Sequence, residues 1–200
     1  MDCEVELEEL SEDFIKELGN IGTGNAVSAL SQLLNCPLEI DTPNLRILHF
    51  QQITEIITEA EVPLAGIMVE VFGEVNGMFL FLLDKTFTGQ VIRLVLGDTV
   101  SDFMNLTEME ESLLLELGNI MCGSYIRALS QLMNVEIDVS VPQISIDMGG
   151  AATSRFLRTS DELLMIDNLF CMDTDTFSGR ILFLPEMESL HVLLRKLEEL

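Results

Sequence analysis

The sequence has few positive charges. Ten Lys and Arg stand against 34 Asp and Glu, which gives a formal net charge of −24 over 200 residues. Nucleic-acid binding depends on clustered Lys and Arg that neutralise phosphates, and anionic membrane surfaces attract basic segments in the same way. The composition therefore argues against a nucleic-acid partner and against binding to an anionic membrane.

The sequence gives no sign of a targeting or anchoring segment. The first six residues are acidic where a signal peptide is basic, and no apolar run approaches the ~20 residues that span a bilayer. We therefore expect a cytoplasmic protein without membrane insertion.

Cysteine and histidine are scarce and scattered. The four cysteines form no C-x-x-C pair, so neither a zinc knuckle nor a disulfide framework is indicated, and a reducing cytoplasm fits. His49 and His191 lie far apart, with no neighbouring Ser or Cys in a catalytic motif. Any chemistry is expected to use carboxylates and amides.

Apolar residues, by contrast, are abundant. They make up 48% of the chain, whereas acidic disordered chains are poor in them. A folded protein with a large core and an acidic exterior is expected, with one domain or two small ones.

An internal repeat with an offset of 99 residues is the most informative feature of the sequence. Three features match in one register. They are Glu17–Ile21 with Glu116–Ile120, Leu30–Asn35 with Leu129–Asn134, and Pro43 with Pro142. We infer a tandem duplication, with repeats at about 8–97 and 107–200 joined by a polar junction.

Each repeat is predicted to begin with a long helix followed by strands. The first helix is expected from an N-cap at Ser11 to about Asn35, and the second at about 108–134. Closing helices are expected at 85–96 and from about Glu186. Apolar stretches predict strands at 38–50, 62–72, 77–83, 135–147, 151–158, 163–171 and 179–184.

Neither repeat has enough strands to cover itself. We therefore predict an α/β fold with a single domain over residues 1–200. Its two pseudo-twofold-related α-β repeats would share one mixed or antiparallel sheet covered by long helices.

Three polar residues on each long helix have i, i+4, i+7 spacing and so share one face. They are Asp13, Glu17 and Asn20 in the first repeat and Ser112, Glu116 and Asn119 in the second. Such a stripe on a single helix is usually a solvated surface. Here, two halves that differ at flanking positions keep the same Glu and Asn, which favours a function.

Two other chemistries are less well supported. Gly22–Asn25 resembles a phosphate-binding loop only in its glycines: no strand precedes it and no Lys follows it, so close helix packing is expected. A metal site at Asp13 and Glu17 would have too few oxygen ligands, and Ser112 weakens the second copy, so no metal site is predicted.

The two stripes carry a resemblance to a known family. Asp13-x-x-x-Glu17-x-x-Asn20, with Pro43 after 22 further residues, matches the signature of the CheC/CheX/FliY family of chemotaxis phosphatases. The second repeat matches it again, from Ser112 to Pro142. Two intact copies resemble the CheC branch, and no added flagellar-switch domain of the FliY kind is expected.

The resemblance implies a phosphatase that acts on the aspartyl-phosphorylated response regulator CheY in two-component signalling. Glu17 and Glu116 would pair with a Lys of CheY, and Asn20 and Asn119 would orient the attacking water. Asp13, Ser112, Pro43 and Pro142 would support the motif. No cofactor of its own is expected, because the regulator would carry Mg²⁺.

Non-catalytic alternatives stay open. The family also binds the receptor deamidase CheD, and the chain could act mainly as a regulator of that partner. Asp147, in an expected turn at 147–151, is a candidate contact, although an ordinary hairpin turn explains it equally well. An acidic scaffold without activity is the third interpretation.

Overall fold

The computed structural model describes residues 2–41, 44–48, 63–148, 163–172 and 178–198. In each repeat the described elements run from a long helix through four strands to a shorter helix. The first repeat contains α1 (Asp2–Leu34), β1 (Leu38–Ile40), β2 (Asn44–Leu48), β3 (Pro63–Gly73), β4 (Gly77–Asp84) and α3 (Lys85–Leu96). The second contains α4 (Glu108–Met133), β5 (Ile137–Val139), β6 (Gln143–Met148), β7 (Leu163–Met172), β8 (Ser178–Pro185) and α6 (Met187–Glu198).

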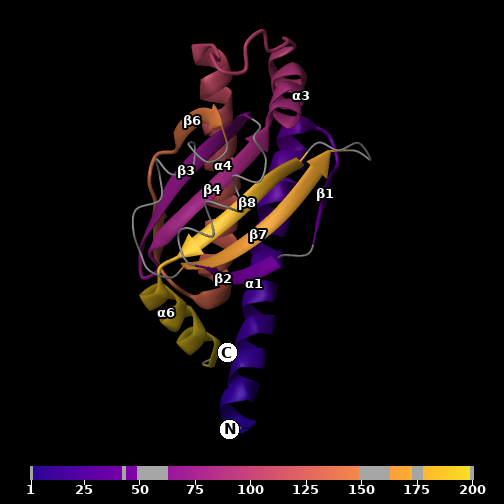
Figure 1. The fold of residues 1–200 in the computed structure, drawn as a ribbon. Helices are drawn as coiled ribbons and strands as arrows, with labels where there is room; N and C mark the ends of the chain where they lie inside the picture. Colours follow the sequence, from indigo (N-terminus) through magenta and orange to yellow (C-terminus); the bar gives the residue numbers. More distant parts are fainter. Residues whose placement is uncertain (1, 42–43, 49–62, 149–162, 173–177, 199–200) are drawn as a thin grey trace.

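The strands form a single sheet with the order β1-β7-β8-β4-β3-β5, in which β2 also pairs with β7 and β6 with β3 (Figure 1). Every pairing is antiparallel. The predicted α/β fold with one shared sheet is confirmed, and of the two sheet types expected the structure has the antiparallel one.

The two repeats exchange their short strands across this sheet. Strands β1 and β2 pair with β7 of the second repeat, and β5 and β6 pair with β3 of the first. At the centre β4 pairs with β8, with Leu80 opposite Leu182. These two leucines occupy matching places in Gly77–Leu82 and Gly179–Leu184, so the pseudo-twofold axis passes through their pair.

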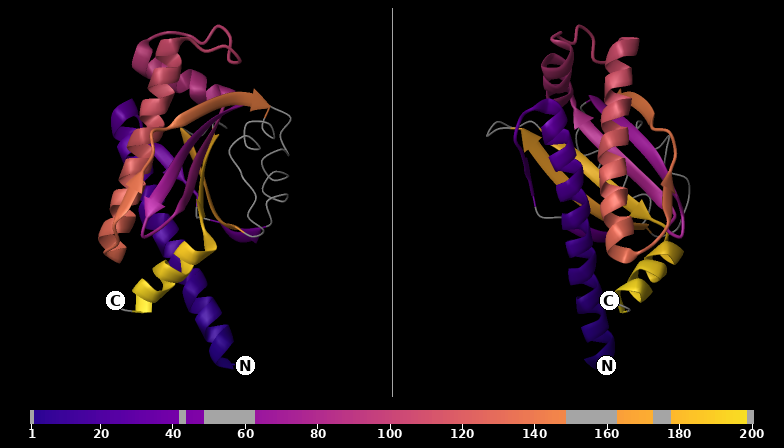
Figure 2. Two further views of the ribbon diagram at one scale, coloured as in Figure 1. Left: turned by 90° about the vertical axis from the view of Figure 1, so that its left-hand side faces the viewer. Right: turned by 180° about the vertical axis from the view of Figure 1, so that it is seen from behind.

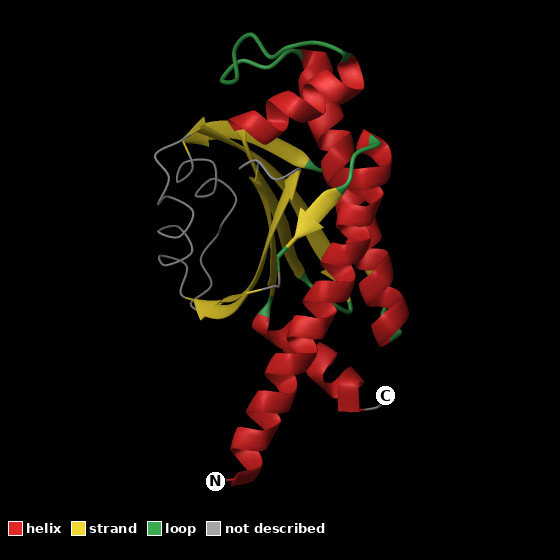
Figure 3. Cartoon of the chain, turned by 90° about the vertical axis from the view of Figure 1, so that its right-hand side faces the viewer, coloured by secondary structure: helices red, strands yellow, loops and turns green. Residues whose placement is uncertain are grey.

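The helices α1 and α4 lie side by side across one face of the sheet (Figure 2). Figure 3 shows the described helices gathered on that side. Aromatic rings fill the space between: the ring centroids of Phe79 and Phe183 are 4.5 Å apart, and those of Phe79 and Tyr125 are 4.6 Å apart. These contacts fix α4 to the central strands.

The N-terminus of α1 differs from the prediction. The helix begins at Asp2, so the expected N-cap at Ser11 is wrong, and the first turns extend beyond the sheet (Figure 1). The reason is local: residues 2–10 are mostly Glu and Leu, with no Gly or Pro to end a helix. For α4 the expected start at 108 is confirmed, with Thr107 as its N-cap.

Two expected strands are interrupted. The strand predicted at 38–50 is split into β1 and β2, and the strand predicted at 135–147 is split into β5 and β6, with Ser140–Pro142 between them. Pro142 has no N–H for a ladder hydrogen bond, which explains the second break. The strand predicted at 151–158 lies outside the described residues.

The repeated Leu30–Asn35 and Leu129–Asn134 segments form matching helix C-caps. Asn35 and Asn134 adopt left-handed backbone conformations, with φ of 50° and 49°. The hydroxyls of Ser31 and Ser130 each donate to the carbonyl five residues on, at 2.6 Å. Capping of the last turn therefore explains why this part of the repeat is retained.

No described helix has the length and apolarity that a membrane span requires.

The close approach of α1 and α4 depends on Gly22. A Cβ built at this position would lie 2.5 Å from the Tyr125 ring, whereas one at Gly24 would have nothing within 4 Å. The predicted packing role of these glycines is confirmed at Gly22 and not at Gly24.

We predict that Gly22→Ala lowers the free energy of unfolding by about 1–3 kcal/mol, because the new methyl overpacks against Tyr125. Gly24→Ala is the matched control and should raise it by up to about 1 kcal/mol through better helix propensity. Urea unfolding of both variants measures the difference. Equal effects would contradict the assigned contact.

Candidate active site

The second repeat carries a groove beside its polar stripe. Ser112, Glu116 and Asn119 lie on α4 with exposed side chains, and they line a hollow of about 530 Å³ together with Leu115 and residues 139–142. The Glu116 and Asn119 side chains make no hydrogen bond or ion pair within the described part of the chain. Both are therefore available to a partner.

Packing on the opposite face of α4 turns this stripe outward. Leu114, Leu117 and Met121 are fully buried against the sheet side. Gly118, between Glu116 and Asn119, is also buried, and a Cβ there would lie 2.6 Å from the Ile67 side chain of β3. The glycine of the repeated motif thus serves packing, while its Glu and Asn face away.

A capping box fixes where α4 begins. The Glu110 carboxylate accepts hydrogen bonds from the Thr107 backbone N–H at 2.7 Å and from its hydroxyl at 2.8 Å. In return the Thr107 hydroxyl accepts from the Glu110 N–H at 3.4 Å. The start of the helix, and with it the position of Ser112 one turn later, is set locally.

The facing wall, residues 139–142, is attached to the other repeat. The Ser140 N–H donates to the Glu70 carbonyl at 2.9 Å, and the Glu70 N–H donates to the Ser140 hydroxyl at 2.9 Å. In the first repeat the Asp41 N–H donates to the Leu169 carbonyl at 3.0 Å, at the matching positions. The two repeats therefore share the backbone hydrogen bond to the other repeat, and the second repeat adds the bond to the Ser140 hydroxyl.

The first site is described only in part. Glu17 and Asn20 are exposed on α1, without a side-chain hydrogen bond or ion pair to the described residues. Pro43 and the Asp13 side chain lie outside the described part, so their roles stay predictions. In the second repeat Pro142 does line the groove.

Asp147 is not in a turn. It lies in β6, paired with Leu64 of β3, because the ladder between these strands continues to Met148. The rest of the expected turn, from Gly149 onward, lies outside the described residues.

The buried thiol on α4 does not add a nucleophile. Burial raises the pKa of Cys122 to about 12, so the thiol is protonated near neutral pH. Within the described ranges, no three His, Cys, Asp or Glu side chains come together as metal ligands would. The chemistry of the groove comes from a carboxylate, an amide and a hydroxyl.

Val141 and Leu115 are groove residues that the sequence analysis missed. Val141 is 82% exposed. In a continuous strand over 135–147, the Val141 side chain would lie on the same face of the sheet as that of Val139, two residues earlier. The signal that could have corrected this was Pro142, which has no N–H for a ladder hydrogen bond and lies in the break between β5 and β6.

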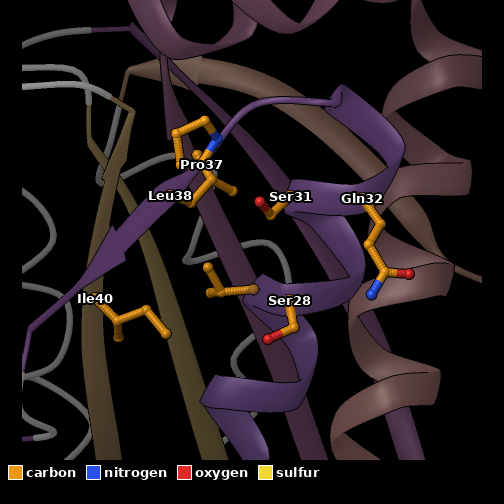
Figure 4. Close-up of a pocket in the computed structure, with 7 residues that line it drawn as sticks. Ser28, Ser31, Gln32, Pro37, Leu38 and Ile40 are labelled. Carbon is orange, nitrogen blue, oxygen red and sulfur yellow. The ribbon is translucent and has the colours of Figure 1, made fainter.

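A second hollow, of about 340 Å³, lies at the C-terminal end of α1 (Figure 4). Ser28, Ser31 and Gln32 of α1 face Leu38 and Ile40 of β1 across it. The Ser31 hydroxyl is already used in the helix cap. With no ionisable residue in its lining, this hollow has no evident catalytic chemistry.

The profile of the CheC-like family matches residues 10–47 and 109–146, which contain the two stripes. The CheY-P phosphatase CheC of Bacillus subtilis is 33% identical over 192 residues, covering 90% of each chain. The flagellar motor switch phosphatase FliY of the same organism is 29% identical over 142 residues, which cover 70% of this chain and 37% of FliY.

Solved structures have the same fold. The crystal structure of Thermotoga maritima FliY superposes with a TM-score of 0.75 at 19% identity, over 94% of this chain and 96% of that one. The chemotaxis protein CheX of Desulfovibrio desulfuricans superposes with a TM-score of 0.61 at 16% identity, over 85% of this chain and 99% of that one.

We predict that Ser140→Ala lowers the free energy of unfolding by about 1 kcal/mol, because the Glu70 N–H loses its acceptor. Ser112→Ala, an exposed serine on the other wall of the groove, is the control and should change stability by less than about 0.5 kcal/mol. Urea unfolding measures both. An unchanged Ser140→Ala variant would show that this pair does not hold the wall.

Proposed function

The chain belongs to the CheC-like family, and from this premise we propose that it dephosphorylates the aspartyl-phosphorylated chemotaxis response regulator CheY. The names of its relatives CheC and FliY support a phosphatase activity of this kind.

One observation carries the proposal to particular residues. The repeats keep Gly118 for packing and Ser130 and Asn134 for a helix cap. Glu116 and Asn119 are kept as well, yet they are exposed and their side chains bond to nothing that the structure describes. Since no folding role accounts for them, we assign them to the reaction.

In the proposed mechanism, Glu116 forms an ion pair with the active-site Lys of CheY and fixes the docking geometry. Asn119 then orients a water molecule in line with phosphorus, because an amide can both accept from and donate to water without taking a charge. Phosphoryl transfer has a loose transition state, so positioning accounts for most of the catalysis. Glu17 and Asn20 take the same roles in the first repeat.

The positive charge needed by the transferred phosphoryl group would come with the partner. None of the residues that line the groove of the second repeat is basic. A free phosphorylated metabolite would require a cationic clamp here, whereas a response regulator carries its own Lys and Mg²⁺. Because this chain has a net charge of −24, it attracts the cationic site of the regulator, and this docking should weaken as salt is added.

The receptor deamidase CheD is the second candidate partner. Asp147 lies in β6 at the β3 edge of the sheet, and among the described strands β6 pairs with β3 alone. An edge strand offers unpaired backbone groups to another protein. Binding of CheD at this edge would be independent of the polar stripes.

We predict that Asn20→Ala and Asn119→Ala each remove the activity of one site. The double variant should lose stimulation by about 100-fold, because the attacking water is no longer oriented. The measurement is phosphate release from phosphorylated CheY. Asn25→Ala, an exposed asparagine on the same helix as Asn20, is the control and should keep the activity.

The double variant should unfold at the same urea concentration as the parent chain, since neither amide bonds to the described residues. Its binding to CheD should also persist. If it stimulates dephosphorylation as well as the parent does, the catalytic assignment is wrong and the binding role takes precedence.

A further inference from the structure

The groove of the second site has an apolar rim, formed by Leu115 and Val141, that the catalytic proposal does not use, and Met109 lies nearer the start of α4. Val141 is 82% exposed and Met109 is 67% exposed, the two highest values among the described large apolar residues. Val141 and Leu115 line the groove with Asn119. Met109 lies three residues before Ser112, on the same face of α4.

Exposure of single apolar side chains is common at protein surfaces. Val141, however, is held in its exposed position. The preceding residue, Ser140, is bonded to β3 through both its N–H and its hydroxyl, and the following residue, Pro142, has a fixed φ. A side chain presented on a restrained backbone needs little further ordering when a partner binds.

The position of Val141 also limits what can reach the proposed catalytic pair. Val141 and Asn119 line opposite walls of one groove. A protein whose phosphorylated aspartate reaches Asn119 enters the groove that the exposed valine also lines. Burial of that side chain is favourable only if the partner presents an apolar surface next to its phosphorylation site.

The first repeat lacks this rim at two of its positions. With the 99-residue offset, Leu115 corresponds to Lys16 and Val141 corresponds to Thr42, whereas Glu116 and Asn119 have identical counterparts. The two sites thus share their proposed chemistry and differ in the residues around it.

We propose that the second site binds the response regulator through an apolar contact, in which Val141, supported by Leu115, packs against an apolar side chain beside the regulator's phosphoaspartate. The inference rests on the proposed function and adds a docking residue to it. Val141 contributes to binding the regulator, and Asn119 contributes to the reaction that follows.

The test uses the full chain with one site active at a time. In the Asn20→Ala background only the second site is active. There, Val141→Thr should raise about 10-fold the concentration of the chain that gives half-maximal stimulation of CheY dephosphorylation, with the maximal rate unchanged. In the Asn119→Ala background, which leaves the first site, the same change should have no effect.

Binding is measured separately, with CheY loaded with beryllium fluoride in place of the phosphoryl group. In the Asn20→Ala background Val141→Thr should weaken this binding about 10-fold. If the Asn20→Ala chain binds the loaded regulator and does not stimulate dephosphorylation, the proposed function fails while the docking role of Val141 is still tested.

Three results would overturn the inference. One is an unchanged half-saturating concentration together with unchanged binding. Another is an equal loss in both backgrounds, which would indicate a general effect on the fold. The third is weakened binding of CheD alone, which would assign Val141 to that partner.

Discussion

The pairing of β4 with β8 is the interaction on which the rest of the structure depends. It joins the two repeats at their symmetry axis, with Leu80 opposite Leu182. The aromatic side chains of these strands, Phe79 and Phe183, then support the ring of Tyr125 on α4. Because Gly22 leaves room for that ring, α1 lies close against α4, and both helices present their polar stripes away from the sheet.

Exchange of the short strands makes each site a product of both repeats. The stripe of the second site lies on α4, but the wall that faces it is bonded to β3 of the first repeat at Glu70. The wall of the first repeat is bonded to β7 of the second at Leu169. A single repeat would have the helix and its Glu and Asn without the strand that holds the opposing wall. Duplication therefore completes the groove.

The sequence was sufficient to predict the shared sheet, the second long helix and the two polar stripes, because each rests on a strong local or repeated signal. The start of α1 could not be placed from Ser11, since residues 2–10 favour a helix as strongly as those that follow. The placement of Asp147 in a strand depends on its pairing with Leu64, which is a tertiary contact that local turn residues do not reveal. The exposure of Val141 depends on the observed break between β5 and β6.

The scaffold features that both repeats share do not require the apolar residues that line the groove of the second site. The helix caps at Asn35 and Asn134 and the backbone hydrogen bonds of Asp41 and Ser140 are shared by both repeats. None of these features requires a valine at 141 or a leucine at 115. A duplicated site can therefore keep the same Glu and Asn while neighbouring positions differ, since Lys16 and Thr42 of the first repeat correspond in sequence to Leu115 and Val141 of the second. In the proposed mechanism affinity would depend on Leu115 and Val141 and the reaction on the Glu and Asn, so the two sites would bind one regulator with different affinity and perform the same reaction on it.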